Sequence, residues 1–363
     1  GTATADKYGG GIKAQSGNST IRNCNVTLNN AESGGAGIML ASGNTVSDCM
    51  ISGNISGYYG GGIYFSGAST VENSIITGNE AAQYGGGVFI SYNNAVIKGS
   101  TINANQSNND GGGIYIDGFA PTIENTVIAD NTATDRGGGI ASREADAVFS
   151  ECFISGNDAP YGGAVSVQGQ SSDYDHLKLT NCLISSNTAT WGAGIYSPSF
   201  ASPSLVNSTM AQNVAANIGG GLWIQSTNSA PTVFNSIIWG NTDGVSSNSD
   251  QIYFPNNGDS FELVVVNSDV QPQGDTWVGS TFNTGNISSD PLFVDPDGQD
   301  NDPAAWEDNN FRLAAGSPAI DTGAAAFAPR SLTAPTIDIE GTDRPKYTTY
   351  DMGAYEYSPG IAY

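Results

Sequence analysis

A short acidic stretch near the C-terminal end is the densest group of residues that could bind a metal ion. Asp295, Asp297, Asp300 and Asp302 lie within eight residues, around Gly298. Carboxylate oxygens at nearly alternating positions suit Ca²⁺, a hard cation that prefers oxygen ligands. The order differs from an EF-hand loop, because the glycine follows the second aspartate rather than a third. The stretch predicts a structural Ca²⁺ site, with an acidic solvated turn as the alternative.

Carbohydrate-cleaving chemistry would need paired carboxylates or clustered cations. A glycosidase uses two carboxyl groups about 5 to 10 Å apart, and a uronate lyase needs cations beside a general base. Glu72 and Glu124 occupy equivalent repeat positions with Lys98 between them, which a surface Glu–Lys–Glu ladder explains more simply. Arg136 and Arg143 form the one close pair of cations in the repeats. We therefore assign no catalytic residue and expect a protein that is not an enzyme.

The single histidine limits metal chemistry further. His176 ends an insertion, Ser171 to His176, for which a solvated loop is the simpler explanation. With one histidine and four cysteines that lack metal-type spacing, zinc has almost no ligands to use.

A glycine-rich tag organises most of the chain. It reads Tyr59-Gly60-Gly61-Gly62-Ile63 in one copy and recurs about every 25 residues. The aliphatic residue that closes each tag is Ile12, Ile38, Ile63, Val88, Ile114, Ile140, Val165, Ile195 and Leu222. A period this short, rich in β-branched residues and glycine, is typical of a solenoid whose coils bury their apolar faces by stacking.

An asparagine series runs in phase with the tags. Its members are Asn29, Asn54, Asn79, Asn105, Asn131, Asn157, Asn187, Asn213 and Asn241. Stacked at the spacing of β-strands, these side chains would form an amide ladder at a turn. Each repeat contains three short β-branched runs separated by Gly, Asn or Ser. The pattern predicts an all-β fold, a right-handed parallel β-helix of about 25–26 residues and three strands per coil.

The cysteines follow the same register. Cys24 and Cys49 are equivalent positions in neighbouring coils, as are Cys152 and Cys182, and other coils place Ser or Thr there. Stacking would bring each pair near disulfide distance, but regular β-stacking rarely gives the torsion that a disulfide needs. We expect stacked thiols in a narrow position, with disulfides as the alternative.

Aromatic residues precede several of the tags. They are Tyr8, Tyr59, Tyr84, Tyr161 and Trp191, and the series is interrupted by Asp110 and Arg136. Such a surface row can offer stacking faces to sugars or to another protein. Residues that merely cover a corner are the simpler explanation.

Composition excludes two classes of partner. The formal net charge is −24, from 35 acidic and 11 basic residues. A chain this acidic repels nucleic acid and anionic membrane surfaces. No run of eighteen apolar residues occurs, so we expect no membrane span.

The repeat divides the chain into four parts. We predict an N-terminal extension over residues 1–7, regular coils over 8–243, irregular last coils over 244–289 and a C-terminal capping region over 290–363. The last part changes to Asp, Pro and aromatic residues and is placed to cover the final coil.

Motifs in the last part carry a family resemblance. They are Asp290-Pro291-Leu292-Phe293, Arg312-Leu313, Gly316-Ser317-Pro318-Ala319-Ile320-Asp321, Asp343-Arg344-Pro345 and Gly353-Ala354-Tyr355-Glu356. The chain resembles secreted bacterial right-handed parallel β-helix proteins, and this region looks like their choice-of-anchor Q group. The glycine tags are similar to repeats of polymorphic outer-membrane proteins and adhesins. The resemblance implies the fold and a secreted or cell-surface location, but not an activity.

One departure from that family suggests a partner. Family members usually open with a covering segment, whereas the first tag here begins at Tyr8. An uncapped coil would present unpaired strand edges to a second copy, giving head-to-tail self-association; a shortened chain is the alternative. We therefore expect an extracellular structural β-helix, as adhesin, scaffold or filament subunit, with surface glycans as further candidate partners. A carbohydrate-active β-helix, either a lyase or a sugar-binding module, is the second hypothesis.

Overall fold

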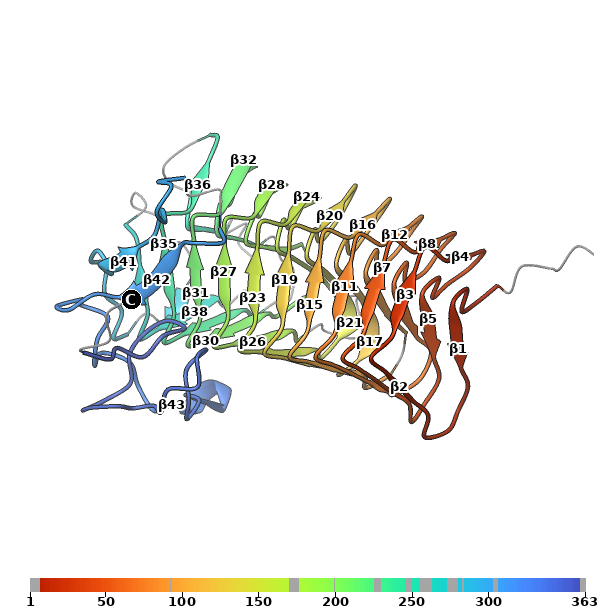
Figure 1. Ribbon diagram of the computed structural model, residues 1–363. Helices are drawn as coiled ribbons and strands as arrows, with labels where there is room; N and C mark the ends of the chain where they lie inside the picture. The colour runs from red at the N-terminus through yellow and green to blue at the C-terminus, as the bar shows by residue number, and fades with distance from the viewer. Residues whose placement is uncertain are drawn as a thin grey trace, which may run out of the picture.

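The computed structural model describes residues 7–91, 93–169, 176–198, 200–224, 230–245, 250–254, 263–272, 280–282, 284–302 and 306–359. These residues form an elongated stack of coils with an irregular C-terminal segment at one end (Figure 1). Within the described residues, no helix is long and apolar enough to cross a membrane. Residues 171–175 of the predicted loop lie outside them.

The first sheet follows the glycine tags. Its ten strands are β1 (Ile12–Ala14), β5 (Ile38–Leu40), β9 (Ile63–Phe65), β13 (Val88–Ser91), β17 (Ile114–Phe119), β21 (Ile140–Ala145), β25 (Val165–Gln168), β29 (Ile195–Ser197), β33 (Leu222–Ile224) and β37 (Ile252–Tyr253). All pair in parallel with the strand one coil away, and the tag residues pair with one another, as Ile12 does with Ile38. The predicted aliphatic stack is therefore present.

The second sheet comes next along each coil. It contains β2 (Thr20–Arg22), β6 (Thr45–Ser47), β10 (Thr70–Glu72), β14 (Val96–Lys98), β18 (Thr122–Glu124), β22 (Val148–Ser150), β26 (Lys178–Thr180), β30 (Ser204–Val206), β34 (Thr232–Phe234), β38 (Leu263–Val266) and β40 (Ser280–Phe282). The middle residue of a typical strand points inward, as Val71 and Ile97 do, and both are fully buried.

The third sheet repeats this pattern. It contains β3 (Asn25–Thr27), β7 (Met50–Ser52), β11 (Ile75–Thr77), β15 (Thr101–Asn103), β19 (Val127–Ala129), β23 (Phe153–Ser155), β27 (Leu183–Ser185), β31 (Thr209–Ala211), β35 (Ile237–Trp239) and β39 (Asp269–Val270). Its first and third residues point outward, because the period of side chains along a strand is two.

The fourth sheet was not predicted from the sequence. Its short strands are β4 (Asn30–Ala31), β8 (Ile55–Ser56), β12 (Glu80–Ala81), β16 (Gln106–Ser107), β20 (Thr132–Ala133), β24 (Asp158–Tyr161), β28 (Thr188–Trp191), β32 (Val214–Ile218) and β36 (Thr242–Asp243). Most coils therefore have four strands rather than three. The parallel β-helix itself is confirmed, and the missed strand is usually two residues long with a small inward residue such as Ala81.

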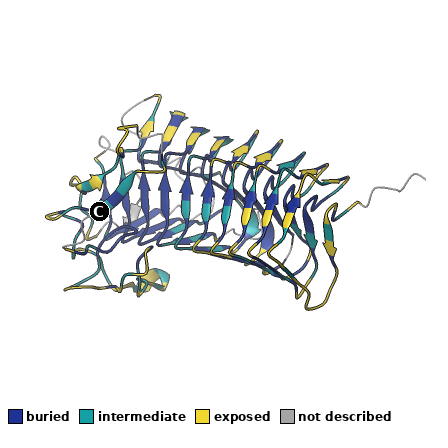
Figure 2. Cartoon of the chain, in the orientation of Figure 1, coloured by how far each residue is buried: buried dark blue, intermediate teal, exposed yellow. Residues whose placement is uncertain are grey.

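The interior is one continuous apolar cluster from Ala14 to Val270. Figure 2 shows buried residues on the strands along the whole stack of coils. Two of the glycines keep the coils close. Gly60 has φ of 55°, and a Cβ there would lie 2.3 Å from the Ile63 carbonyl oxygen. A Cβ on Gly62 would lie 2.7 Å from the Gly87 carbonyl oxygen of the next coil. A larger residue at either place would push the backbone apart.

The C-terminal segment packs sideways on the coils. It includes two antiparallel pairs, β41 (Phe293–Asp295) with β42 (Asn310–Leu313) and β43 (Ala326–Phe327) with β44 (Leu332–Thr333), and a 3₁₀ turn at Ala328–Arg330. Its apolar residues meet the outer faces of the second and third sheets. We call residues 290–359 the cover, because the contacts that hold it lie along the last coils.

Corner asparagines hold the cover in place. Asn181, Asn207 and Asn235 lie in left-handed conformation between the second and third sheets. Their side-chain amides donate to the carbonyl oxygens of Ile337, Asp351 and Ala324, at 2.7, 3.2 and 2.6 Å. Thr209 Oγ1 also accepts a hydrogen bond from the Ala354 amide, at 3.0 Å.

Candidate functional site

The outer face of the first sheet has a row of aromatic side chains. The row, which we call the aromatic row, reads Tyr64, Phe89, Tyr115, Ala141, Ser166, Tyr196, Trp223 and Tyr253 in consecutive coils. Phe89 and Tyr115 stack with ring centroids 5.4 Å apart, and Tyr196 and Trp223 with centroids 4.5 Å apart. Two groups of stacked rings are thus separated by the small residues Ala141 and Ser166.

The aromatic residues predicted from the tags form a second row beside the first. Tyr59 packs against Phe89 at 4.7 Å between centroids, and Tyr84 against Tyr115 at 4.6 Å. Tyr8 stacks on Tyr64 at 5.6 Å. In the later coils Tyr161 meets Tyr196 and Trp191 meets Trp223. The predicted residues therefore belong to a double row of rings.

A hollow of about 260 Å³ opens in the first aromatic group. It is lined by Tyr59, Tyr64, Tyr84, Phe89, Ser91, Tyr115, Asp117 and Arg143. The polar wall consists of Ser91, Asp117 and Arg143, which are register partners on successive strands. Arg143 Nη2 donates to both carboxylate oxygens of Asp117, at 2.9 and 2.8 Å. This two-pronged geometry fixes the carboxylate and neutralises its charge.

Titratable groups near the hollow are shifted by burial. Burial raises the pKa of Tyr59, Tyr64 and Tyr115 further above the ordinary tyrosine value. Their hydroxyls are protonated at neutral pH, as those of ordinary tyrosines are, and can donate hydrogen bonds. Burial also raises the pKa of Asp110 to about 6, against the opposing effect of the Arg136 charge. Asp110 Oδ1 is buried and has no hydrogen-bond partner within the described structure.

Arg136 lies between the two aromatic groups. Its guanidinium lies 6.0 Å from the centre of the Tyr161 ring and 3.6 Å from Asp135 Oδ2. With the Gln168 amide oxygen turned toward it, that oxygen is 2.9 Å from Arg136 Nε. The two arginines that the sequence placed close together thus lie in the same coil, each beside a carboxylate.

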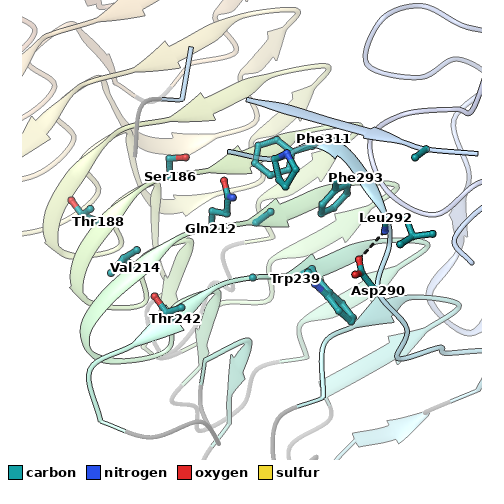
Figure 3. A pocket seen from close by; sticks show the side chains of 14 residues that line it. Ser186, Thr188, Gln212, Val214, Trp239, Thr242, Asp290, Leu292, Phe293 and Phe311 are labelled. Carbon is teal, nitrogen blue, oxygen red and sulfur yellow. Dashed lines mark hydrogen bonds between the residues drawn. The ribbon is translucent and has the colours of Figure 1, made fainter. Parts of the chain in front are cut away.

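A larger pocket of about 740 Å³ lies between the coils and the cover (Figure 3). Its walls are Ser186, Thr188, Ala211, Gln212, Val214, Trp239, Gly240, Thr242, Asp290, Leu292, Phe293, Pro296, Phe311 and Ala314. Most of these side chains are apolar or aromatic. Because the walls come from residues 186–242 of the coils and residues 290–314 of the cover, repeat analysis does not detect this pocket.

Comparison with known proteins identifies the fold family. The family model described as "Right handed beta helix region" matches residues 2–108 and 87–258, more than half of the chain. The chain belongs to this right-handed β-helix family. No curated protein sequence matches it. Among solved structures, the crystal structure of pectate lyase Pel9A is similar, with 14% identity, a TM-score of 0.44 and coverage of 88% of this chain and 89% of that one.

The asparagine series of this β-helix protein forms a continuous buried ladder. Asn54 Nδ2 donates to Asn79 Oδ1 at 2.9 Å, and Asn79 donates to Asn105 in the same way. The ladder runs from Asn29 through the nine predicted residues and ends on Gln251, whose Oε1 accepts from Asn241 Nδ2 at 2.8 Å. The amides also donate to strand carbonyls, such as that of Ile51. Their role in this geometry is to hold the corner together.

The four cysteines are free thiols in the structure. Each lies one residue after a left-handed corner residue, and Cys49, Cys152 and Cys182 are buried. Their Sγ atoms donate to carbonyl oxygens, as Cys49 does to Ser47 at 3.1 Å. Burial raises the pKa of Cys49 and Cys152, so these thiols are poor nucleophiles.

The predicted calcium ligands do not converge. Asp300 Oδ1 accepts from the Asp302 amide, and Asp297 Oδ1 accepts from Gln212 Nε2 at 2.7 Å. In the described part of the chain, no group of three or more His, Cys, Asp or Glu side chains is placed to hold a metal ion. The four residues thus provide no preformed cage, and Ca²⁺ binding stays a prediction.

The remaining candidates are surface groups. Lys98 Nζ lies 3.0 Å from Glu72 Oε2, and Glu72, Lys98 and Glu124 are register partners on the second sheet, as in the predicted ladder. His176 Nδ1 lies 3.0 Å from Asp146 Oδ1, and both side chains are mostly exposed.

Proposed function

We propose that this protein is a glycan-binding β-helix that acts outside the cell, with a neutral saccharide bound on the outer face of the first sheet. The observation that supports this most directly is the hollow beside Asp117. It combines flat aromatic walls with a fixed carboxylate, a guanidinium and protonated tyrosine hydroxyls. Sugars present apolar ring faces and hydroxyl groups, so aromatic stacking and polar acceptors recognise them together.

The charge of the hollow favours a neutral sugar over a uronate. The carboxylate of Asp117 already occupies two donors of Arg143, so a uronate would have to displace it or bind beside a like charge. The chain as a whole carries a net charge of −24, which adds repulsion. Binding without cleavage accords with an adhesin or scaffold, in which the rigid solenoid presents a long surface.

Glycan-array screening followed by calorimetry tests the proposal. We expect binding to neutral oligosaccharides and roughly tenfold weaker binding by Tyr59→Ser and Tyr84→Ser, because one aromatic contact is worth about 0.5–1.5 kcal/mol. Tyr347→Ser is the matched control, since Tyr347 is exposed on the cover and lies outside the hollow. Equal binding by the Tyr59→Ser variant, or a preference for uronates, would overturn the proposal.

The same experiments separate binding from catalysis. A binding protein leaves the oligosaccharide intact during long incubation, whereas a carbohydrate-active enzyme releases shorter products. Chromatography of the incubated sugar therefore distinguishes the two hypotheses. Product release that Asp110→Asn abolishes would replace the binding role by an enzymatic one.

A further inference from the structure

The pocket under the cover is a second candidate site, on a different face from the glycan surface. Its volume of about 740 Å³ lies within the range of about 300–1,000 Å³ that is typical of small-molecule pockets. Figure 3 shows Trp239 and Asp290 at one end of the pocket, and Thr188, Val214 and Thr242 at the other. Phe293 and Phe311, which meet edge to face at 5.3 Å between centroids, form the wall that the cover contributes.

Two exposed apolar residues lie at this pocket. Val214 is 48% exposed, although the equivalent residues Asp158 and Thr188 of the preceding coils are polar. Leu292 is 42% exposed and has a φ of 50°, a conformation that L-residues other than Asn and Asp rarely adopt. Val214 and Leu292 thus give the pocket two exposed apolar side chains.

The charges around the pocket define the ligand further. Asp290 is the charged residue of the described walls, and it is followed by Asp295, Asp297, Asp300 and Asp302 in the same segment. The sequence contains no Lys, Arg or His between Lys178 and Arg312. Arg312 itself pairs with Glu340 and lies over the ring of Tyr355. The described lining contains no Lys, Arg or His, so it offers an anionic ligand no compensating charge, whereas a cation would be attracted.

Aromatic walls and a carboxylate together suit an organic ammonium group. Such cations bind over aromatic rings through the negative potential of the ring face. A bare metal ion would not use the apolar walls, and no set of metal ligands is present among the described residues. We propose that this pocket binds a small organic ammonium ion with an apolar or aromatic body, its ammonium near Asp290 and Trp239 and its body against Phe293 and Phe311.

Calorimetry with three probes of matched shape tests this inference. Phenethylammonium should bind the full chain, 2-phenylethanol should bind roughly tenfold more weakly, and phenylacetate should not bind. Asp290→Asn should weaken phenethylammonium binding roughly tenfold and leave 2-phenylethanol unchanged. The asparagine keeps the oxygen that accepts the Leu292 amide at 2.9 Å, so the turn is preserved.

Two variants locate the site. Asp300→Asn removes an acidic residue of the same segment that does not line the pocket and should leave binding unchanged. Tyr59→Ser alters the glycan hollow and should also leave it unchanged, so the two proposals can fail independently. No binding of phenethylammonium at millimolar concentration, equal binding of the ammonium and the alcohol, or equal losses in Asp290→Asn and Asp300→Asn would each overturn the inference.

Discussion

The outer face of the third sheet differs between the early and the late coils. Ile75 and Ile237 occupy the same position in their coils, and both point away from the core. Ile75 is 43% exposed, whereas Ile237 is 1% exposed because Leu313, Ala319 and Met352 of the cover pack on it. An identical outward residue can thus be surface or core, depending on what a distant segment does. The repeat determines position, and the cover determines burial.

The asparagine ladder is common to both regions and should give the largest effect. Asn157 is fully buried, accepts two hydrogen bonds from Asn131 and donates to Ile128 and Asn187. Asn157→Ala leaves several buried groups without partners, at about 1–3 kcal/mol each. We expect a loss of about 4 kcal/mol in the free energy of unfolding, measured with urea. Asn29→Ala, at the partly exposed end, should cost about 1 kcal/mol, and equal losses would contradict a cooperative ladder.

Removing one aromatic ring of the cover should affect the late coils and leave the early coils unchanged. Phe311 is 1% exposed and packs on Leu183 and Ala211. Phe311→Ala should weaken the docking of the cover by about 3 kcal/mol, since it leaves a cavity. Hydrogen exchange should then rise in residues 290–359 and in the late coils, but not in the early coils. Tyr347→Ala, an exposed change in the same segment, is the control; uniform exchange across the chain would show that the cover is not a separate unit.

The late coils also contain a buried carboxyl group that makes stability depend on pH. Burial raises the pKa of Asp269 from 3.8 to about 7, and its Oδ2 has no hydrogen-bond partner within the described structure. Between about pH 4 and 7 the folded chain keeps a proton that the unfolded chain loses, so the free energy of unfolding falls as pH rises through this window. Each unit of pKa difference corresponds to about 1.4 kcal/mol.

Asp269→Asn should remove this dependence. We expect the variant to be more stable than the original chain at pH 8, by on the order of 2 kcal/mol, and similar to it near pH 4. Thermal unfolding at both values measures the difference, with the exposed Asp300→Asn as control. A variant that is less stable at pH 8 would show that the carboxylate has a partner that stabilises its charged form.

The sequence predicted the main repeating series, but it missed one repeating strand and every contact that does not repeat. The Ile12 and Asn29 series follow from a 25–26-residue period, because parallel stacking places equivalent residues above one another. The fourth strand was missed because most of its copies are only two residues long. The aromatic row was detectable, since Tyr64, Phe89 and Tyr115 each follow the residue that closes a tag.

Contacts between the cover and the coils could not be predicted from the repeat pattern. Asn73 and Asn125 occupy the same corner as Asn235 and share its left-handed conformation. Of these three residues, Asn235 is the one that bonds to the cover. Its side chain binds both the amide and the carbonyl of Ala324, a residue 89 positions away. No local sequence signal distinguishes Asn235, because all three asparagines suit the left-handed backbone of the corner. Whether the side chain also contacts the cover depends on where the cover docks. The pocket beside Trp239 depends on the same docking.

The smallest expected effect comes from the same substitution made at one position in each region. Ile237→Val removes one methylene from a site that the cover buries, so we expect a loss of about 1 kcal/mol. Ile75→Val makes the same chemical change at the same position of an uncovered coil and should cost less than about 0.5 kcal/mol. Urea unfolding of both variants, followed by the same pair in the Phe311→Ala background, forms a double-mutant cycle. If the cover is what buries Ile237, its cost should fall toward that of Ile75 once the cover is loosened. An unchanged cost would mean that the late coils pack Ile237 without help from the cover.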